Sequence, residues 1–395
     1  MVQLASNALK HRILFLVTED WYFASHRLAF AQQLIANGLE VAVACRVGTS
    51  AELIERAGIR VFPVPFARER VSPLTILRAA WILRRLIRMY RPNLVHLVSL
   101  RPILIGWFAT LGQSRPPFVN AITGMGTLFT GSPMRLRLRL VRLAVRLFFR
   151  HTFSHATAEN VFQNEEDQRA FLERGLTTAA RAHLIRGAGV DSEAWTPHSE
   201  PQLPKPVVLF LSRLLRDKGL AELVQASALL HRRGVQHVLR VVGDIDPCNP
   251  SSFSIQEVQA WQAGGMVEWL GWQTNVLEQM SHANLVVLPS YREGLPKVLL
   301  EAGVAGRAVV TCDVVGCREV VRDGVNGLLV PARDPEKLAD AIERLLTNPT
   351  LRSRLADEHR RRVASEFSQH VVHGQFSRLY EKLLPKANSL NGGFD

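Results

Sequence analysis

Residues 284–301 read Asn-Leu-Val-Val-Leu-Pro-Ser-Tyr-Arg-Glu-Gly-Leu-Pro-Lys-Val-Leu-Leu-Glu and contain the clearest structural signal of the chain. Its first part, 285–288, is a short apolar run of the kind that forms a buried strand. Pro296 suits the first position of a helix, because the N–H that proline lacks would be unpaired there anyway. We therefore expect a strand, a turn and then a helix from about Lys297, which is the repeating unit of a parallel α/β sheet.

The same stretch carries two carboxylates, Glu293 and Glu301, on either side of the expected helix start. Gly294 allows a ligand to approach the backbone, and the free N–H groups at a helix start favour an anion. Carboxylates accept hydrogen bonds from sugar and ribose hydroxyls, so the stretch predicts a nucleotide-sugar site. The alternative is that Glu293 caps the helix and Glu301 is solvated. Against it, Glu301 lies among apolar residues, where a carboxylate needs a partner.

The length and composition set the frame for this prediction. A chain of 395 residues has room for two domains. The four cysteines have no zinc-like spacing, which favours a reduced, cytoplasmic protein with buried thiols. The run 13–17 is too short for a signal peptide or a membrane span and reads as a first strand. The net charge of +13 predicts an anionic partner, such as nucleic acid, a phosphorylated substrate or a membrane surface.

Strand-like and helix-like segments alternate along the chain, and the pattern starts twice. The first series of apolar runs is 13–17, 41–45, 61–64, 94–98 and 118–122, and the second is 207–211, 238–242, 267–270, 285–288, 308–311 and 327–330. A glycine- and proline-rich stretch between them, 187–206, is the expected hinge. Such alternation predicts two Rossmann-like, doubly wound domains that face each other across a cleft. We expect residues 1–187 with 366–395 to form one domain and residues 188–365 the other.

In a doubly wound sheet, ligands bind beyond the carboxyl ends of the strands, and charged residues of this chain fall there. Arg213 and Lys218 follow the strand that ends near residue 211. Two cations five positions apart can clamp a diphosphate and stabilise charge that develops on it. The alternative is a solvated surface loop.

These motifs, in this order, resemble the retaining GT-B glycosyltransferases of family 4. The motifs are Arg213…Lys218-Gly219, Val242-Gly243-Asp244, Gly271-Trp272, Pro289-Ser290 to Glu301, and Gly324-Val325-Asn326-Gly327 to Pro331. The resemblance covers nearly the whole chain and is strongest from 205 to 365. The stretch 120–130 further resembles bacterial enzymes that extend undecaprenyl-diphosphate-linked oligosaccharides, including N-acetylgalactosaminyltransferases.

The resemblance implies a role for each matching residue. Glu301 would hold the ribose hydroxyls of the donor, Glu293 its sugar, and Arg213 with Lys218 its diphosphate. Glu293, Arg213 and Lys218 form the expected catalytic set. The expected donor-binding set is Gly243, Trp272, Thr274, Asn275, Gly294, Leu295, Lys297, Val298 and Glu301. The reaction would move a hexose or N-acetylhexosamine from a nucleotide sugar, with UDP expected, to a lipid-linked saccharide and retain the anomeric configuration. No cofactor or metal is expected.

The first domain departs from the family pattern in two places. Many members carry a histidine where this chain reads Ile122-Thr123-Gly124, and a glycine-rich turn where it reads 19–27. We expect Trp21, His26, Arg27, Thr123 and Gly124 to bind the acceptor, although packing at a helix start would also explain His26. The sequence Asp244-Ile245-Asp246 resembles a metal motif but is expected to cap a loop, and His96 is expected in the core.

Two arginine-rich segments raise the question of a membrane. Residues 134–150 contain six arginines and no acid, and residues 78–91 combine arginines with leucine, tryptophan and tyrosine. Basic, apolar helices of this kind bind anionic bilayers, which predicts a peripheral protein on the inner face of the cytoplasmic membrane. The alternative is two outer helices with a solvated basic face. At 135–140 the alternation of Arg and Leu would also fit a strand.

Other functions fit the sequence less well. A nicotinamide dehydrogenase would carry G-x-G-x-x-G after the first strand, which this chain lacks. A basic nucleic-acid-binding protein would place aromatic side chains among its basic residues, whereas here arginine lies beside leucine, so no nucleic acid is expected as a partner. A GT-B-fold sugar-nucleotide epimerase or phosphorylase is the nearest alternative among enzymes.

Overall fold

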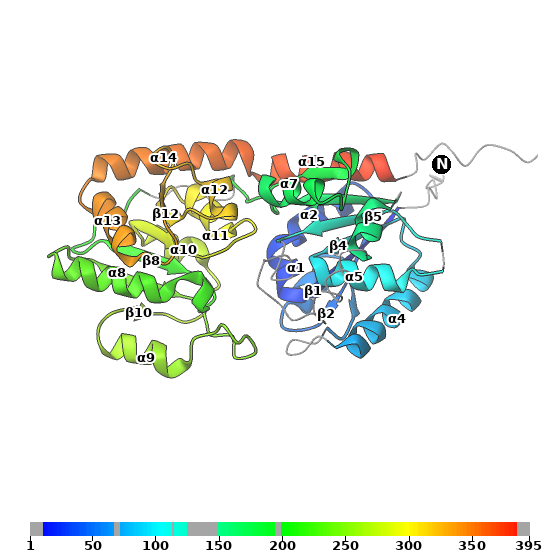
Figure 1. Ribbon diagram of the computed structural model, residues 1–395, viewed down its shortest axis with the longest axis horizontal. Coiled ribbons are helices and arrows are strands. Elements are labelled where there is room, and N and C mark those ends of the chain that lie inside the picture. The colour runs from blue at the N-terminus through cyan, green and yellow to red at the C-terminus, as the bar shows by residue number, and fades with distance from the viewer. Residues whose placement is uncertain are drawn as a thin grey trace, which may run out of the picture. The chain divides into compact units, whose positions relative to one another are not determined.

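The computed structural model describes residues 11–66, 72–112, 114–124, 148–155, 157–193 and 199–384. The chain divides into two compact units, residues 1–188 with 373–395 and residues 189–372. The boundaries expected from the sequence lie at 187/188 and 365/366. Each unit is described separately below (Figure 1).

The first unit is built on a parallel sheet with the strand order β3-β2-β1-β4-β5-β6-β7. Its strands are β1 (Arg12–Glu19), β2 (Glu40–Arg46), β3 (Arg60–Pro63), β4 (Leu94–Val98), β5 (Phe118–Ile122), β6 (Ala158–Phe162) and β7 (Ala182–Leu184). Its helices are α1 (Asp20–His26), α2 (Leu28–Ala36), α3 (Ala51–Arg56), α4 (Pro73–Tyr90), α5 (Leu100–Ala109) and α7 (Glu165–Glu173), with a 3-10 turn η2 (Ala179–Arg181). The strand order reverses between β1 and β4, where such sheets bind ligands.

Strands β6 and β7 were not predicted from the sequence. The β6 sequence Ala-Glu-Asn-Val-Phe lacks a continuous apolar run, yet all five residues are buried. The Asn160 amide donates to the Thr177 hydroxyl at 2.9 Å and to the Phe153 carbonyl at 2.8 Å, while its oxygen accepts from Asn120 at 3.0 Å. Hydrogen bonds of this kind make it possible to bury a polar residue, and no sequence pattern announces them.

The second unit is also a parallel α/β unit, with the strand order β10-β9-β8-β11-β12-β13. Its strands are β8 (Val207–Leu211), β9 (Val238–Val242), β10 (Glu268–Trp269), β11 (Leu285–Leu288), β12 (Ala308–Cys312) and β13 (Leu328–Val330). Its helices are α8 (Leu220–Arg232), α9 (Ile255–Ala263), α10 (Val276–Ser281), α11 (Lys297–Val304), α12 (Val315–Val320), α13 (Pro335–Leu346) and α14 (Pro349–Glu366), with a 3-10 turn η3 (Arg216–Lys218). Here the strand order reverses between β8 and β11. Two parallel-sheet α/β units confirm the predicted fold class.

Helix α11 packs closely on α14, and glycine at one position permits this contact. A Cβ at Gly303 would lie 2.6 Å from Val363 Cγ2 and 3.1 Å from His359 Cδ2. The His359 ring Nε2 lies 2.8 Å from the Leu299 carbonyl, and its Nδ1 lies 2.9 Å from the Asn326 amide. These contacts hold α11, and therefore the turn before it, in one position.

The last helix, α15 (Gln369–Leu383), contributes its residues from His373 onward to the first unit. Phe376 and Tyr380 are buried there, and the Tyr380 hydroxyl lies 2.6 Å from His96 Nδ1. His96 is buried and stacks on Phe15, with ring centroids 5.0 Å apart. Burial lowers the pKa of His96 well below its ordinary value, and the Arg27 charge lowers it further. His96 is thus a neutral core residue that holds α15.

Candidate functional site

The candidate site lies where the strand order of the second unit reverses. Arg213 and Lys218 follow β8, and Glu293 follows β11, the strand beside it. The carboxyl ends of parallel neighbours meet at one edge of a sheet, so residues 75 positions apart can come together there. This edge collects the charged residues predicted from the sequence.

The loop after β8 packs directly against the turn after β11. The Tyr291 N–H donates to the Asp217 carbonyl at 2.9 Å. Gly219 adopts a positive φ of 75°, and a Cβ there would lie only 2.1 Å from the Pro289 carbonyl oxygen. Only glycine combines this backbone conformation with so close an approach. The glycine after Lys218 therefore fixes the lysine beside the turn.

Lys218 and Glu293 form a close ion pair in this corner. Lys218 Nζ donates to Glu293 Oε1 at 2.5 Å, and both side chains are largely buried. A lysine from the loop after β8 and a carboxylate from the turn after β11 are thus in direct contact. A paired Lys and Glu can present a positive and a negative group to adjoining parts of one ligand.

The second carboxylate of the turn lies on α11, whose first turn is oriented toward the same edge. Glu301 is buried, and its Oε1 accepts from Lys297 Nζ at 2.7 Å, one helical turn earlier. The buried Glu301 carboxylate therefore has a charged partner, as its apolar surroundings in the sequence predicted.

Helix α11 begins at Lys297, as predicted, and Pro296 is the residue before it, not its first residue. The Leu299 N–H donates to the Pro296 carbonyl at 3.1 Å, so the N–H groups of Lys297 and Val298 are the ones that would meet an anion at the helix start. Leu295 and Val298 pack on the core beside it.

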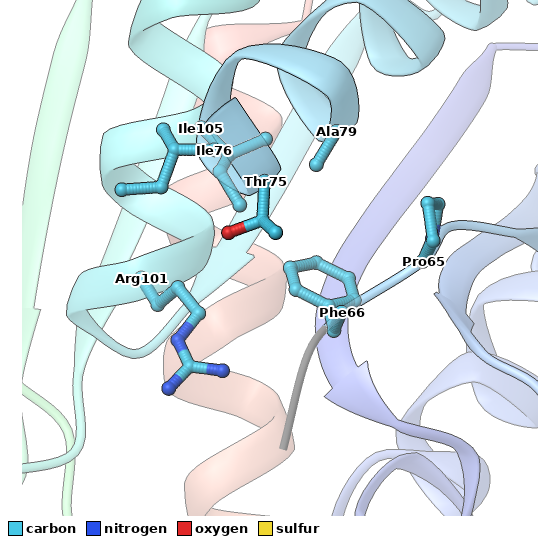
Figure 2. Close-up of a pocket in the computed structure, with 7 residues that line it drawn as sticks. All are labelled: Pro65, Phe66, Thr75, Ile76, Ala79, Arg101 and Ile105. Atoms are coloured by element: carbon cyan, nitrogen blue, oxygen red, sulfur yellow. The ribbon is translucent and has the colours of Figure 1, made fainter. Parts of the chain in front are cut away.

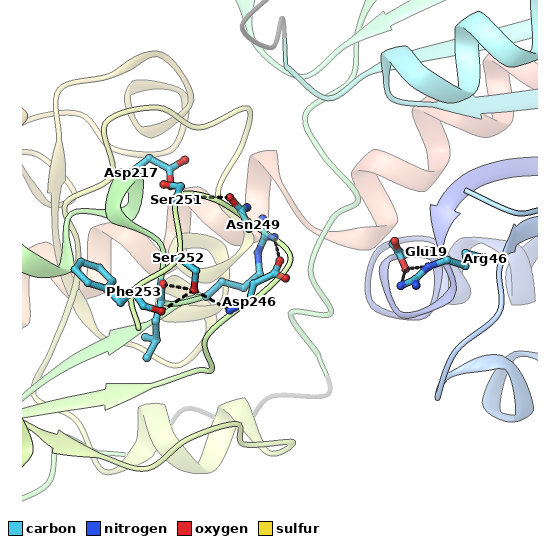
Figure 3. Close-up of polar contacts among 10 residues, drawn as sticks. Glu19, Arg46, Asp217, Asp246, Asn249, Ser251, Ser252 and Phe253 are labelled. Carbon is cyan, nitrogen blue, oxygen red and sulfur yellow. Dashed lines mark hydrogen bonds and ion pairs between the residues drawn. The ribbon is translucent and has the colours of Figure 1, made fainter. Parts of the chain in front are cut away.

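Arg213 has a different partner from Lys218. Its Nη1 donates to Asp246 Oδ2 at 3.2 Å, in the loop after β9. The two loops are joined by backbone bonds, including one from Leu214 N to the Asp244 carbonyl at 2.9 Å. Figure 3 shows the loop around Asp246. Gly243 makes this packing possible, because a Cβ there would lie 1.9 Å from the Ser212 carbonyl oxygen.

The stretch after β10 places an exposed aromatic ring at the same end of the sheet. Trp272 has 68% of its surface exposed, which is unusual for tryptophan. Thr274 is exposed, and Asn275 caps α10 by accepting from Glu278 N at 3.1 Å. The Gly271 carbonyl accepts from Gly243 N at 2.9 Å, which ties this stretch to the loop after β9. An exposed ring held in this way can stack on a planar base.

A cysteine lies behind the turn and takes no part in its chemistry. Cys317 on α12 is buried, and its sulfur accepts from the Thr311 hydroxyl at 3.0 Å. Burial raises the pKa of the Cys317 thiol above its ordinary value, and the negative charge of Glu293 raises it further. The thiol is therefore protonated and unreactive. Cys45 and Cys312 are also buried, but Cys248 is exposed, which corrects the expectation that the thiols are buried.

The acceptor residues predicted from the sequence lie in the first unit and have different surroundings. Trp21 is 38% exposed, and the His26 ring stacks on Tyr22 with centroids 4.2 Å apart. Thr123 and Gly124 follow β5 and are half-buried. Arg27, in contrast, is buried with its guanidinium 5.0 Å from the Phe376 ring centre, and burial lowers its pKa. The structure thus places Trp21 at the surface and Arg27 in the interior.

The motif Asp244-Ile245-Asp246 is used within its own loops. The Asp244 carboxylate accepts from Ile245 N at 2.9 Å, while Asp246 contacts Arg213. Among the residues that the structure describes, no group of three or more His, Cys, Asp or Glu side chains is arranged to hold a metal ion.

Sequence reasoning missed two features of the site. The pairing of Asp246 with Arg213 joins two loops 33 residues apart, and no sequence signal announces it. The i,i+4 spacing of Lys297 and Glu301 would have predicted their ion pair. A third contact, from the Tyr291 hydroxyl to Glu222 Oε1 at 2.5 Å, also supports the turn.

Comparison with known proteins agrees with this geometry. Residues 191–362 match the family described as "Glycosyl transferases group 1", and residues 12–158 match "Glycosyl transferase 4-like". One relative is the N,N'-diacetylbacillosaminyl-diphospho-undecaprenol alpha-1,3-N-acetylgalactosaminyltransferase of Campylobacter jejuni, 24% identical over 339 residues that cover 83% of this chain and 87% of the relative.

Solved structures show the same fold. The sucrose-phosphate synthase of Thermosynechococcus elongatus superposes with a TM-score of 0.76 at 22% identity, covering 95% of this chain and 99% of the other. HepE from Anabaena, in complex with UDP and glucose, gives a TM-score of 0.73 at 21% identity over 94% and 99% of the two chains. Both units thus match glycosyltransferase families, and the chain belongs to the glycosyltransferases of the GT-B fold, with a family 4-like first unit and a group 1 second unit.

Proposed function

We propose that this glycosyltransferase moves a hexose or N-acetylhexosamine from a nucleotide sugar, with UDP as the nucleotide, to a lipid-linked saccharide. The observation that carries the proposal is the Lys218–Glu293 contact of 2.5 Å, beside the first turn of α11 with Glu301. Cations for a diphosphate and carboxylates for hydroxyl groups lie at one edge of the sheet. The UDP held by HepE and the lipid-linked saccharide in the name of the Campylobacter relative support the choice of substrates.

The proposed roles follow from the chemistry of each side chain. Glu301 accepts hydrogen bonds from the ribose hydroxyls, and Glu293 does so from the donor sugar. Lys218, Arg213 and the first N–H groups of α11 stabilise the charge that develops on the leaving diphosphate. Trp272 lies beside the base, with Gly243, Thr274 and Asn275 nearby, and the backbone of Gly294, Leu295, Lys297 and Val298 lines the sugar and distal phosphate.

We further propose that the anomeric configuration is retained. The bond between the sugar carbon C1 and the phosphate oxygen breaks while the acceptor oxygen bonds to C1 on the same face. The acceptor proton passes to the leaving phosphate oxygen. These steps need no metal, because Arg213, Lys218 and the helix start supply the positive charge. Trp21, His26, Thr123 and Gly124 are the proposed acceptor residues.

The membrane surface is the third proposed partner, through the outer face of α4. Leu74, Leu77, Trp81 and Met89 are exposed on this helix, and Arg85 stacks on Trp81 at 4.5 Å from the ring centre. The segment 73–90 contains no acid. Exposed leucine and tryptophan beside arginine suit the interface of an anionic bilayer. The Arg-rich segment 134–147 lies outside the described residues, and no helix in the described part of the chain is long and apolar enough to cross a membrane.

The other face of α4 is turned toward its own unit. Thr75, Ile76 and Ala79 line a pocket together with Phe66 and Arg101 (Figure 2). Arg84 donates to the Leu111 carbonyl at 2.6 Å. Arg84 is therefore used inside the first unit. The proposed membrane face keeps Arg78, Arg85 and Arg88, and the enzyme would work as a peripheral protein on the inner face of the cytoplasmic membrane.

One experiment tests the proposed activity against its alternatives. The purified chain is incubated with a panel of radiolabelled UDP-hexoses and UDP-N-acetylhexosamines, with and without an undecaprenyl-diphosphate-linked saccharide. We expect label to move to the lipid only when the acceptor is present, and the new linkage to keep the anomeric configuration of the donor by NMR. Conversion of the donor to its epimer, or phosphate-dependent release of sugar 1-phosphate, would contradict the proposal.

A further inference from the structure

Each of the three cations at the donor site is paired with an acid of the same site. The pairs are Arg213 Nη1 with Asp246 Oδ2 at 3.2 Å, Lys218 Nζ with Glu293 Oε1 at 2.5 Å, and Lys297 Nζ with Glu301 Oε1 at 2.7 Å. A diphosphate brings further negative charge to these cations. Its charge therefore competes electrostatically with the acids already paired to them.

The Arg213–Asp246 pair differs from the other two in three respects. Its contact is the longest of the three. Its acid is also the most exposed, since 24% of the Asp246 side chain is accessible, against 12% for Glu293 and 10% for Glu301. Arg213 itself is 47% exposed. An exposed, single-contact ion pair is the weakest kind, so it opens at the least cost.

Asp246 also lacks a role toward the donor. In the proposed function Glu293 and Glu301 both accept hydrogen bonds from donor hydroxyls, which offset the loss of a lysine partner. Asp246 has no proposed hydrogen bond to the donor. Its carboxylate contacts Arg213 instead. When Arg213 turns to the diphosphate, the Asp246 carboxylate has only solvent to replace it.

The Asp246 carboxylate stays near the site when Arg213 moves, because both backbone polar groups of Asp246 are hydrogen-bonded within its loop. Asp246 N donates to the Ser252 hydroxyl at 2.9 Å, and its carbonyl accepts from Asn249 N at 2.8 Å (Figure 3). Ser252 pairs with Leu215 in an isolated antiparallel bridge, which ties the loop to the one that carries Arg213. The negative charge is therefore fixed close to the place proposed for the diphosphate.

Resting on the proposed function, we infer that Asp246 competes with the donor diphosphate for Arg213. The Asp246 carboxylate accepts one N–H of the Arg213 guanidinium until the diphosphate replaces the carboxylate. The negative charge of Asp246 then repels the nucleoside diphosphate product. Asp246 is thus a positioning residue that weakens binding of the product and speeds its release. A merely structural residue at this place would have the opposite effect, because its loss would loosen the loop and weaken binding.

The test is the dissociation constant of UDP, measured by calorimetry on the whole chain at low salt. We expect Asp246→Asn to bind UDP about five- to tenfold more tightly, since one exposed ion pair and one nearby like charge are removed. Asp246→Ala should shift binding in the same direction, because it removes the same charge. The gain should shrink as salt is raised, and turnover limited by product release should fall.

A matched control lies nearby. Glu257 pairs with Arg216 at 2.7 Å and closes a capping box with Ser254 at the start of α9. Glutamine also serves in a capping box, so Glu257→Gln removes one negative charge and one arginine pair while keeping the helix start. We expect it to leave the UDP dissociation constant unchanged.

A further variant separates this inference from the proposed function on which it rests. If Arg213→Gln does not weaken UDP binding, the proposed role of Arg213 is wrong. If Arg213→Gln weakens binding while Asp246→Asn leaves the affinity unchanged or lower, the role of Asp246 is overturned and that of Arg213 stands. In the double variant the gain from Asp246→Asn should be smaller than in the wild-type background, as expected for coupled residues.

Discussion

At the scale of single residues, the two glutamates of the turn after β11 have distinct positions. Glu301 lies on α11 and is held by Lys297 of the same helix. Glu293 lies before the helix and is held by Lys218, which comes from the loop after a different strand. One carboxylate is therefore fixed by its own helix and the other by the meeting of two loops.

This difference predicts different effects on catalysis. Glu301→Ala should weaken binding of the donor by about 1.5–3 kcal/mol, because it removes charge-assisted bonds to the ribose. Glu293→Ala should mainly lower turnover, because its contact is nearer the reacting carbon. Calorimetry with the donor and initial rates give the two quantities. Glu268→Ala, which removes the Arg240 partner on β10, is the control. Equal, mild losses of turnover in both site variants with unchanged donor affinity would contradict these roles.

Much of the turn after β11 could be predicted from the sequence, but the residues that pair with its charged side chains could not. The apolar run, the proline and the buried setting of Glu301 predict the strand, the turn, the helix and the need for a counter-charge. The sequence grouped Arg213 with Lys218, but the structure pairs each with a different acid. Which acid pairs with which cation depends on how three loops pack against one another, including the close approach at Gly219. No local sequence pattern predicts this packing.

At the scale of elements, His359 joins α14 to α11 and to the turn before β13. Its ring is buried between the Leu299 carbonyl and the Asn326 amide. A neutral ring that donates from Nε2 and accepts at Nδ1 satisfies both partners. Burial lowers the pKa of His359 to about 4.

The lowered pKa predicts a loss of stability in acid. In the unfolded chain His359 has a pKa of about 6.5, so between about 6.5 and about 4 the unfolded state binds more protons than the folded one. The stabilisation is therefore complete above pH 6.5 and falls as the pH drops toward 4, by on the order of 3 kcal/mol. Urea unfolding at several pH values measures this. His359→Gln should flatten the slope in that window, and an unchanged slope would show that His359 does not titrate in this way.

The second prediction at this scale concerns binding of α4 to anionic membranes. Replacing Arg78, Arg85 and Arg88 with Gln should lower binding to vesicles that contain anionic lipid, since each basic residue near such a surface contributes about 1 kcal/mol. Flotation with anionic and neutral vesicles measures it. The same change at Arg354, Arg360 and Arg361 on α14 removes equal charge and is the control. Equal flotation with neutral and anionic vesicles would leave α4 as a solvated basic face.

At the scale of the whole molecule, the alternation of strands and helices predicted the fold well. The run of strand signals, interrupted near Gly187, gives two parallel sheets, and both are present. The missed strand β6 carries polar residues whose burial depends on neighbours distant in sequence, and the missed strand β7 is only three half-buried residues long. The structure's unit boundary at 372/373 falls inside α15, and no signal in the sequence marks a change of unit within a continuous helix.

The positive charge supplied by the protein also predicts how the enzyme responds to chelators. Arg213, Lys218 and the start of α11 are proposed to stabilise the leaving diphosphate. Transfer should therefore continue in EDTA at its full rate. Complete loss of activity in EDTA that manganese or magnesium restores would show that a metal supplies the charge instead.

Hydrogen–deuterium exchange of the whole chain, with and without UDP, shows which residues bind the nucleotide. Binding slows exchange of amides that it covers or steadies. We predict slower exchange in residues 212–219, 271–276 and 290–301 of the second unit, and a much smaller effect in the Lys218→Gln variant. Protection confined to the first unit, or equal protection in Lys218→Gln, would contradict the assignment of the donor site.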